Sequence, residues 1–201
     1  HKILAAIRAL EGGISFSGIV EADELLMKYS EKGRKFKNKE EYQKAKKKKH
    51  PKVAVLVVTD REGNLLFKQV GEIKVKNEQL REELKSRLSE NNLICVKPKK
   101  EFRKAVKSLQ SKKVIVNKRQ IKRGIYSVKI VENKISDFRT WLSRFHGVAT
   151  KYLQSYLMWF VIMNKYLKEL IDSDIGRLLN LSSHDRWAWD KYREIVSQKY
   201  E

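Results

Sequence analysis

The sequence predicts an α/β domain, a mixed five-stranded sheet flanked by helices, with a C-terminal helical extension. Three observations carry this prediction. Apolar runs typical of strands come close together near the start, strands then alternate with amphipathic helices, and a long apolar stripe at helical spacing follows the last strand. Because 41% of the 201 residues are hydrophobic, the chain can bury a full core.

The first part of the chain is predicted to form a helix and then three antiparallel strands. A hairpin turn with the sequence DREGN separates the second strand from the third. A polar, lysine-rich loop with a short helix separates the first strand from the second. The predicted ranges are 1–10 for the first helix, 16–23 for the first strand, 28–51 for the loop, 40–47 for the short helix, and 52–59 and 65–73 for the hairpin strands.

Strands and helices alternate in the second part. The predicted ranges are 77–91 (helix), 93–96 (strand), 98–109 (helix), 113–116 (strand), 128–145 (closing helix), 149–170 (helix) and 184–200 (last helix). A three-strand meander followed by strand, helix and strand is the order of the ribonuclease H-like fold. We therefore expect a ribonuclease H-like domain over 1–167, with a basic insertion loop at 28–51, and a helical extension over 168–201.

The positive charge is concentrated in two segments. The formal net charge is +21, and residues 28–52 and 97–123 each contain twelve lysines and arginines, against three acidic residues in the first segment and one in the second. Two such segments with interleaved aromatic residues favour two surfaces that face a polyanion. We expect DNA to be this partner, with RNA as the second candidate; a solvated loop and an acidic protein partner are the alternatives. The candidate contact residues are Lys46, Lys47, Lys48, Lys49, Lys99, Lys100, Arg103, Lys104, Lys118, Arg119, Lys122 and Arg123.

Composition excludes several classes of protein. One cysteine, Cys95, allows neither a disulfide nor a cysteine-rich zinc site within these residues. No apolar run reaches the roughly 18 residues that a membrane span requires. We expect a cytoplasmic, nucleoid-associated protein that does not contact a membrane. Residues 149–201 begin with a helix that is apolar nearly all round, so we expect them to contact other protein subunits or a second copy of the chain.

The segment GIVEADE, residues 18–24, is the candidate site. Carboxylates cluster at few other places in this basic chain, and strand alternation puts Glu21 and Asp23 on one face. Carboxylates at the end of a buried strand are typical of the ligands in two-metal phosphoryl-transfer enzymes. A solvated strand end is the alternative.

Three stretches resemble DDE-type transposases of bacterial insertion sequences, in the branch that carries a zinc ribbon ahead of a ribonuclease H-like catalytic domain. They are WLSRFHGVATKYLQSYLMWF in the closing helices, GIVEADE in the first strand and VLVVTDREGN in the second and third strands. The resemblance covers roughly residues 1–165, without the zinc ribbon. It implies DNA strand transfer, in which three metal-binding side chains hold two magnesium ions.

The resemblance also implies where the metal ligands should stand. The first falls on Asp23, the second on Lys97 after the strand 93–96, and the third on Ile135, so two of the three are missing. Lys97 repels a divalent cation, and Ile135 belongs to the apolar stripe of the closing helix. These replacements predict a transposase-derived nucleic-acid-binding or scaffolding protein that is catalytically inactive, needs no metal or cofactor, and acts within a larger nucleoprotein assembly.

The alternative is an active transposase that performs magnesium-dependent DNA strand transfer. Glu21, Asp23 and Glu132 would form a shifted metal site, because Glu132 lies one helical turn before Ile135. If Asp23 is only a remnant, replacing it with asparagine should change the stability by less than about 1 kcal/mol. The remaining candidates for chemistry are expected to be structural; they are His50, His146 and Ser127.

Overall fold

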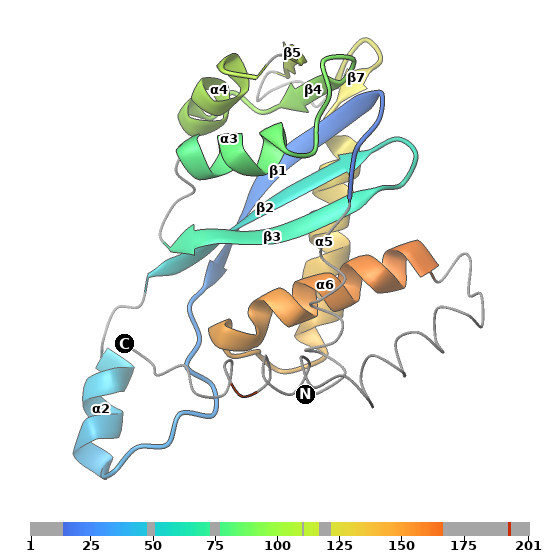
Figure 1. Ribbon diagram of the computed structural model, residues 1–201. Helices are drawn as coiled ribbons and strands as arrows, with labels where there is room; N and C mark the ends of the chain where they lie inside the picture. Colours follow the sequence, from blue (N-terminus) through green and yellow to red (C-terminus); the bar gives the residue numbers. More distant parts are fainter. Residues whose placement is uncertain are drawn as a thin grey trace.

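The computed structural model describes residues 14–47, 51–72, 77–109, 111–116, 122–166 and 193. In these residues a five-stranded sheet and a two-stranded ribbon are accompanied by helices on both faces of the sheet (Figure 1). The strands are β1 (Ile19–Lys28), β2 (Lys52–Asp60), β3 (Leu65–Glu72), β4 (Leu93–Val96), β5 (Lys112–Ile115), β6 (Lys122–Arg123) and β7 (Tyr126–Ser127). The helices are α2 (Lys39–Lys47), α3 (Asn77–Lys85), α4 (Lys100–Lys107), α5 (Lys129–Ser143) and α6 (Thr150–Tyr166).

Strand β1 lies at the centre of the sheet, whose order is β3-β2-β1-β4-β5. Strands β1, β2 and β3 form an antiparallel meander, whereas β4 pairs parallel with β1, and β5 pairs parallel with β4. This mixed order is the one predicted for a ribonuclease H-like domain, so the predicted fold class is confirmed.

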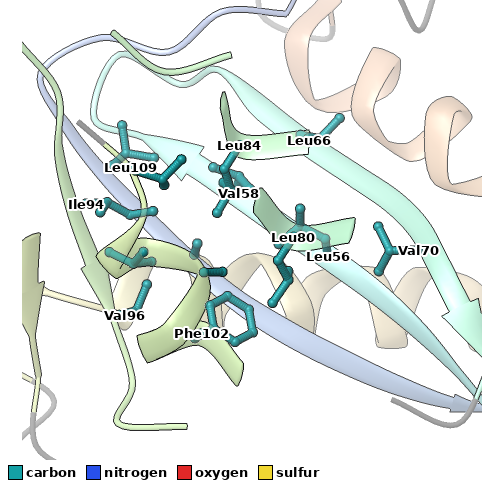
Figure 2. Packing of buried hydrophobic residues seen from close by; sticks show 14 of the residues in the cluster. Leu56, Val58, Leu66, Val70, Leu80, Leu84, Ile94, Val96, Phe102 and Leu109 are labelled. Carbon is teal, nitrogen blue, oxygen red and sulfur yellow. The ribbon is translucent and has the colours of Figure 1, made fainter. Parts of the chain in front are cut away.

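Alternating side chains of the central strands divide the interior into two cores. The first core lies under α3 and α4, where Leu80, Leu84 and Phe102 cover the sheet (Figure 2). The second core lies under α5 and α6. Strand β2 is buried on both faces, which explains its nearly continuous apolar sequence. Its side chains alternate between Ala54, Leu56 and Val58 in the first core and Val53, Val55 and Val57 in the second.

An aromatic cluster joins β3, α5 and α6 in the second core. The ring of Phe67 lies 5.0 Å from that of Phe138 and 5.4 Å from that of Phe160, measured between centroids. Trp141 and Trp159 continue the cluster with centroids 5.2 Å apart. Pairs of this geometry add about 0.5–1.5 kcal/mol each beyond the burial of their surface. The cluster fixes α5 over the face of β1 that carries Glu21 and Asp23.

Several element boundaries differ from the prediction. Strand β1 continues to Lys28, because β2 pairs with it along its whole length, so Asp23 lies in the middle of the strand and not at its end. Helix α3 ends at Lys85, earlier than predicted. The ribbon of β6 and β7 was not predicted, since each of its strands is two residues long. The helices predicted at 1–10 and 184–200 and the extension 168–201 lie outside the described residues, apart from residue 193.

The insertion between β1 and β2 contains the short helix that the sequence predicts. Helix α2 spans Lys39–Lys47, close to the short helix predicted at 40–47. The side chain of Asn38 caps this helix, because its Oδ1 atom accepts a hydrogen bond of 2.8 Å from the N–H of Glu41.

Among the described helices, none is both long and apolar enough to cross a membrane.

Candidate functional site

The candidate site lies where β1 and β4 run side by side. Their parallel register pairs Glu21 with Cys95 and Ala22 with Val96, so Lys97, the residue after β4, comes next to Asp23. Because side chains alternate along a strand, Asp23 and Lys97 project from the face of the sheet that α5 covers.

Lys97 bridges two carboxylates that come from different elements. Its Nζ atom lies 2.8 Å from Oδ2 of Asp23 and 2.5 Å from Oε1 of Glu132. Glu132 belongs to the first turn of α5. A second lysine, Lys99, places its Nζ atom 2.6 Å from Oδ1 of Asp23 and 3.8 Å from Oε2 of Glu24. Both carboxylate oxygens of Asp23 therefore face an ammonium group. We call Asp23, Lys97, Lys99 and Glu132 the Asp23 cluster.

The charges of this cluster compensate one another. The side chain of Asp23 is 5% exposed, and burial alone would raise its pKa. Hydrogen bonds from Lys97 and Lys99, the charge of Lys99 and the N–H of Glu24 outweigh burial and hold the pKa of Asp23 below its usual value. Burial would also lower the pKa of Lys97, but its hydrogen bonds to Asp23 and Glu132 raise it. Asp23 is therefore a carboxylate and Lys97 an ammonium at neutral pH.

Glu21 is fully buried and holds the start of α5. Its Oε2 atom accepts hydrogen bonds from the N–H groups of Ile130 (2.9 Å) and Val131 (3.2 Å), and its Oε1 atom accepts one from the hydroxyl of Ser127 (2.9 Å). These first N–H groups of a helix have no partner within it, and the helix dipole favours a negative charge there. Glu21 therefore fixes α5 to β1. Because both of its carboxylate oxygens are used in this way, Glu21 does not share a metal site with Asp23.

Glu132, and not Ile135, is the residue of α5 that reaches Asp23. Ile135 is buried in the second core, as its place in the apolar stripe predicted. Glu132, one turn earlier, meets Asp23 through the ammonium of Lys97. Of the two α5 residues considered for the third ligand, Glu132 therefore lies at the Asp23 cluster and Ile135 lies in the second core. The ammonium of Lys97 lies between this α5 carboxylate and Asp23.

The side chains at this site do not fit a magnesium ion. Magnesium takes oxygen ligands at about 2.0–2.1 Å, whereas the space between Asp23 and Glu132 is occupied by the ammonium of Lys97. Within the part of the chain that the structure describes, no three His, Cys, Asp or Glu side chains are grouped so that they could hold a metal ion.

The predicted nucleic-acid contacts fall on different parts of the molecule. Those that are exposed are Lys47 on α2 and Lys100, Arg103 and Lys104 on α4. Lys99 points to Asp23 instead, so its charge is already compensated. Lys46 belongs to α2, and Lys122 and Arg123 form β6. The predicted contacts outside the described residues are Lys48, Lys49, Lys118 and Arg119.

Of the other groups considered for chemistry, the structure describes Ser127 and His146. Ser127 donates to Glu21, an acid that lies 106 positions away in the sequence. Burial, together with the charge of Glu21, raises the pKa of the Cys95 thiol to about 11, so the thiol is not a nucleophile at neutral pH. His146 lies in the turn after α5 with a φ of 50°. His50 lies outside the described residues.

The sequence prediction missed the contact between Lys99 and Asp23. A signal for it exists, because Lys97 and Lys99 follow β4 at alternate positions and therefore leave the strand on the same face. Using that signal requires knowing that β4 lies beside β1 in parallel, which the sheet topology supplies and local sequence does not.

Comparison with known proteins identifies the family. Neither the curated proteins nor the solved structures give a match. The family model of the ISXO2-like transposase domain matches residues 15–163, which contain the whole five-stranded sheet, the Asp23 cluster and α5. This is well over half of the 201 residues, and it confirms the resemblance to insertion-sequence transposases. The chain belongs to the ISXO2-like transposase family.

Proposed function

We propose that this chain is a DNA-binding, scaffolding member of the transposase family that has lost strand-transfer catalysis. The observation that carries the proposal is the position of the Lys97 ammonium, 2.8 Å from Asp23 and 2.5 Å from Glu132. Membership of a transposase family implies an interaction with DNA. The protein would therefore keep the family's ligand and lose the family's reaction.

The chemistry of strand transfer explains why one lysine matters. Two-metal phosphoryl transfer needs carboxylates that hold divalent cations against the phosphodiester. Two unit positive charges 4 Å apart repel by about 4 kcal/mol at an effective dielectric of 20, and a divalent ion doubles this. Lys97 therefore opposes metal binding between Asp23 and Glu132. Its positive charge repels the metal ion, in addition to the absence of a ligand at this position.

Exposed cations on α4 supply one surface for DNA. Lys100, Arg103, Lys104 and Lys107 are exposed along this helix, and none of them pairs with an acid of the described chain. Lysine and arginine contacts to phosphate give affinity without sequence specificity. RNA presents the same phosphate charge and is the second candidate. The DNA-bound protein would reside on the cytoplasmic nucleoid, and residues 149–201 would join it to other subunits or to a second copy in a larger assembly.

One observation favours an active transposase as a second candidate. Asp23 and Glu132 are both present and both reach the same cation. If DNA drew Lys97 onto a phosphate, two carboxylates would face one space. Magnesium-dependent strand transfer would then become feasible.

Incubation of the purified protein with plasmid DNA and with short duplexes, in magnesium and in manganese, tests the proposal. We expect binding without nicking or joining, and the same result for Asp23→Ala. Metal-dependent cleavage that Asp23→Ala abolishes would establish the active transposase instead. Failure to bind DNA or RNA at low salt would overturn the nucleic-acid function and favour an acidic protein partner.

A further inference from the structure

We infer that residues 28–47 form a preformed arm that grips the backbone of duplex DNA at a second place on the molecule. The inference rests on the proposed DNA binding and adds a separate surface to it. The arm leaves the sheet at the end of β1 and contains α2. Figure 1 shows α2 standing clear of the sheet at one end of the molecule, whereas α4 lies at the other.

Two hydrogen bonds lock the base of the arm to the start of α6. The N–H of Ser30 donates to Oγ1 of Thr150 at 2.8 Å, and the N–H of Thr150 donates to the carbonyl of Ser30 at 2.8 Å. Because both bonds involve the main chain of residue 30, they fix the direction in which the arm leaves the sheet.

Lys32 ties the arm to the turn between α5 and α6. Its Nζ atom donates to three successive carbonyls, those of Phe145 (3.1 Å), His146 (3.1 Å) and Gly147 (2.8 Å). These carbonyls converge because His146 and Gly147 adopt positive φ angles of 50° and 94°. Carbonyls just past a helix end lack helical partners and attract a cation. Lys32 is therefore a positioning residue whose ammonium is directed at the turn between α5 and α6.

Arg34 holds the arm together from inside. Its guanidinium pairs with Glu31 at 2.8 Å and with Glu41 of α2 at 3.1 Å. It also lies 5.1 Å from the ring centroid of Phe36, which in turn packs edge-on against Tyr42 at 5.4 Å. Two of the three acids in the arm are thus engaged internally, and the arm is folded before any ligand binds.

The outer side of the arm stays positively charged. The exposed lysines that form no ion pair with an acid of the described chain are Lys35, Lys39, Lys44 and Lys47. The charge of Lys37, which is also exposed, acts on Glu41. Tyr42, on the same helix as Lys39, Lys44 and Lys47, is 46% exposed. Tyrosine hydroxyls are among the side-chain groups that bind phosphate oxygens of DNA.

This surface fits a polyanionic backbone better than it fits a protein. The cores of protein interfaces are depleted of lysine and enriched in apolar and aromatic residues, whereas Tyr42 is the one large hydrophobic side chain exposed on the described part of the arm. Because the arm is already folded and anchored, DNA binding does not have to order it, and its lysines contribute more than those of a flexible loop would.

Four variants and the parent, titrated with one 30-base-pair duplex over a range of salt concentrations, test the inference. The arm variant is Lys39→Gln, Lys44→Gln and Lys47→Gln; the anchor variant is Lys32→Met; the second-surface variant is Lys100→Gln, Arg103→Gln and Lys104→Gln; and the control is Lys85→Met, exposed on α3. Circular dichroism and thermal unfolding establish that each variant is folded.

We expect the arm variant to reduce the slope of log affinity against log salt by about 0.9 for each phosphate that it no longer neutralises. The anchor variant should bind at least about threefold more weakly than the Lys85→Met control, because the arm must then be ordered on binding. Its salt slope should match the control, since Lys32 contacts no phosphate. A lower affinity with an unchanged salt slope indicates that Lys32 positions the arm. A lower affinity with a reduced slope indicates that Lys32 itself contacts a phosphate.

The outcomes separate the arm from the proposed function. If the parent does not bind DNA, the proposed function fails. If the second-surface variant binds more weakly while the arm variant titrates like the control, DNA binding stands and the arm inference is wrong. If the arm variant has a reduced slope but the anchor variant behaves as the control does, the arm contacts DNA without being preorganised by Lys32, which overturns the anchoring.

Discussion

The ammonium of Lys97 lies 2.8 Å from the carboxylate of Asp23, across two parallel strands at the centre of the sheet. Glu132 extends this pair to α5. Carboxylates brought this close would repel one another without a cation between them. Lys97 therefore joins β1, β4 and α5 by supplying a covalently attached counter-charge. We propose that this is the place where metal ions would bind in an active member of the family.

Replacing Lys97 with methionine should destabilise the fold. The change leaves Asp23 buried with Lys99 as its remaining ammonium partner, and it leaves Glu132 without the cation that draws it to the site. We expect the free energy of unfolding in urea to fall by about 1–3 kcal/mol. Lys107→Met, the same change at an exposed position of α4, is the control and should stay within about 0.5 kcal/mol. Equal effects of the two changes would contradict a structural role for the cluster.

Replacing Asp23 with asparagine should cost more than the roughly 1 kcal/mol expected for an isolated remnant, because Asp23 accepts hydrogen bonds from two lysines. The loss should depend on pH. The pKa of Asp23 is depressed below 3.8 in the folded protein, so its charge stabilises the fold above that value and this contribution is lost as the pH falls further. Denaturant titrations from about pH 6 to pH 2 should show parent and Asp23→Asn converging in acid. A constant difference across that range would show that the charge of Asp23 is not what matters.

Much of the fold could be predicted because its signals are local. The alternation in β2 and the apolar stripe of α5 each follow from a period that burial imposes on consecutive residues. The two faces of the sheet, and the shared face of Glu21 and Asp23, follow from the same alternation. The stripe places Ile135 in the core, but it does not show that Glu132, one turn earlier, reaches Lys97, because that contact joins α5 to the end of β4.

The arm and the Asp23 cluster could be predicted only in part, because long-range contacts define them. In the sequence, a polar segment contains Arg34, Phe36 and Tyr42 without a regular spacing. Only the packing of these side chains shows that the segment is folded. Lys32 meets its three carbonyls across more than a hundred positions of sequence. The spacing of apolar residues along the sequence does not predict such contacts.

Gln154 of α6 covers part of the edge of β3. Its Oε1 atom accepts a hydrogen bond of 2.8 Å from the N–H of Gln69, and its Nε2 atom donates to the carbonyl of Phe67 at 3.4 Å. A residue of a neighbouring parallel strand would bond the same two groups. The side-chain amide thus replaces one residue of a sixth strand at the place where α6 crosses the edge.

Replacing Gln154 with leucine should therefore destabilise the protein and expose a strand edge. The N–H of Gln69 and the carbonyl of Phe67 would be left without their partner in a buried place, at a cost of about 1–3 kcal/mol. An uncovered edge also pairs readily with another chain. Unfolding in urea and sedimentation velocity measure the two effects, with Gln43→Leu on the exposed side of α2 as the control. Unchanged stability and an unchanged sedimentation coefficient would mean that the amide is dispensable.

Replacing Lys97 with aspartate should turn the Asp23 cluster into a metal site. The change puts a third carboxylate beside Asp23 and Glu132, and three carboxylates in one place repel unless a divalent cation binds them. Without metal, the variant should be less stable than the parent. At a manganese concentration ten times the dissociation constant, binding should restore about 1.4 kcal/mol, which corresponds to a rise in Tm of a few degrees for a domain of this size.

The parent protein should show no such rise in Tm, because Lys97 already occupies the space between the two carboxylates. Adding Asp23→Asn to the Lys97→Asp variant removes one ligand and should abolish the response to manganese. Lys99 still pairs with Asp23 in the single variant, so adding Lys99→Met should strengthen the response. A parent that manganese stabilises as much as it stabilises the Lys97→Asp variant would mean that Lys97 does not exclude the metal. The proposed loss of catalysis would then need an explanation other than this one side chain.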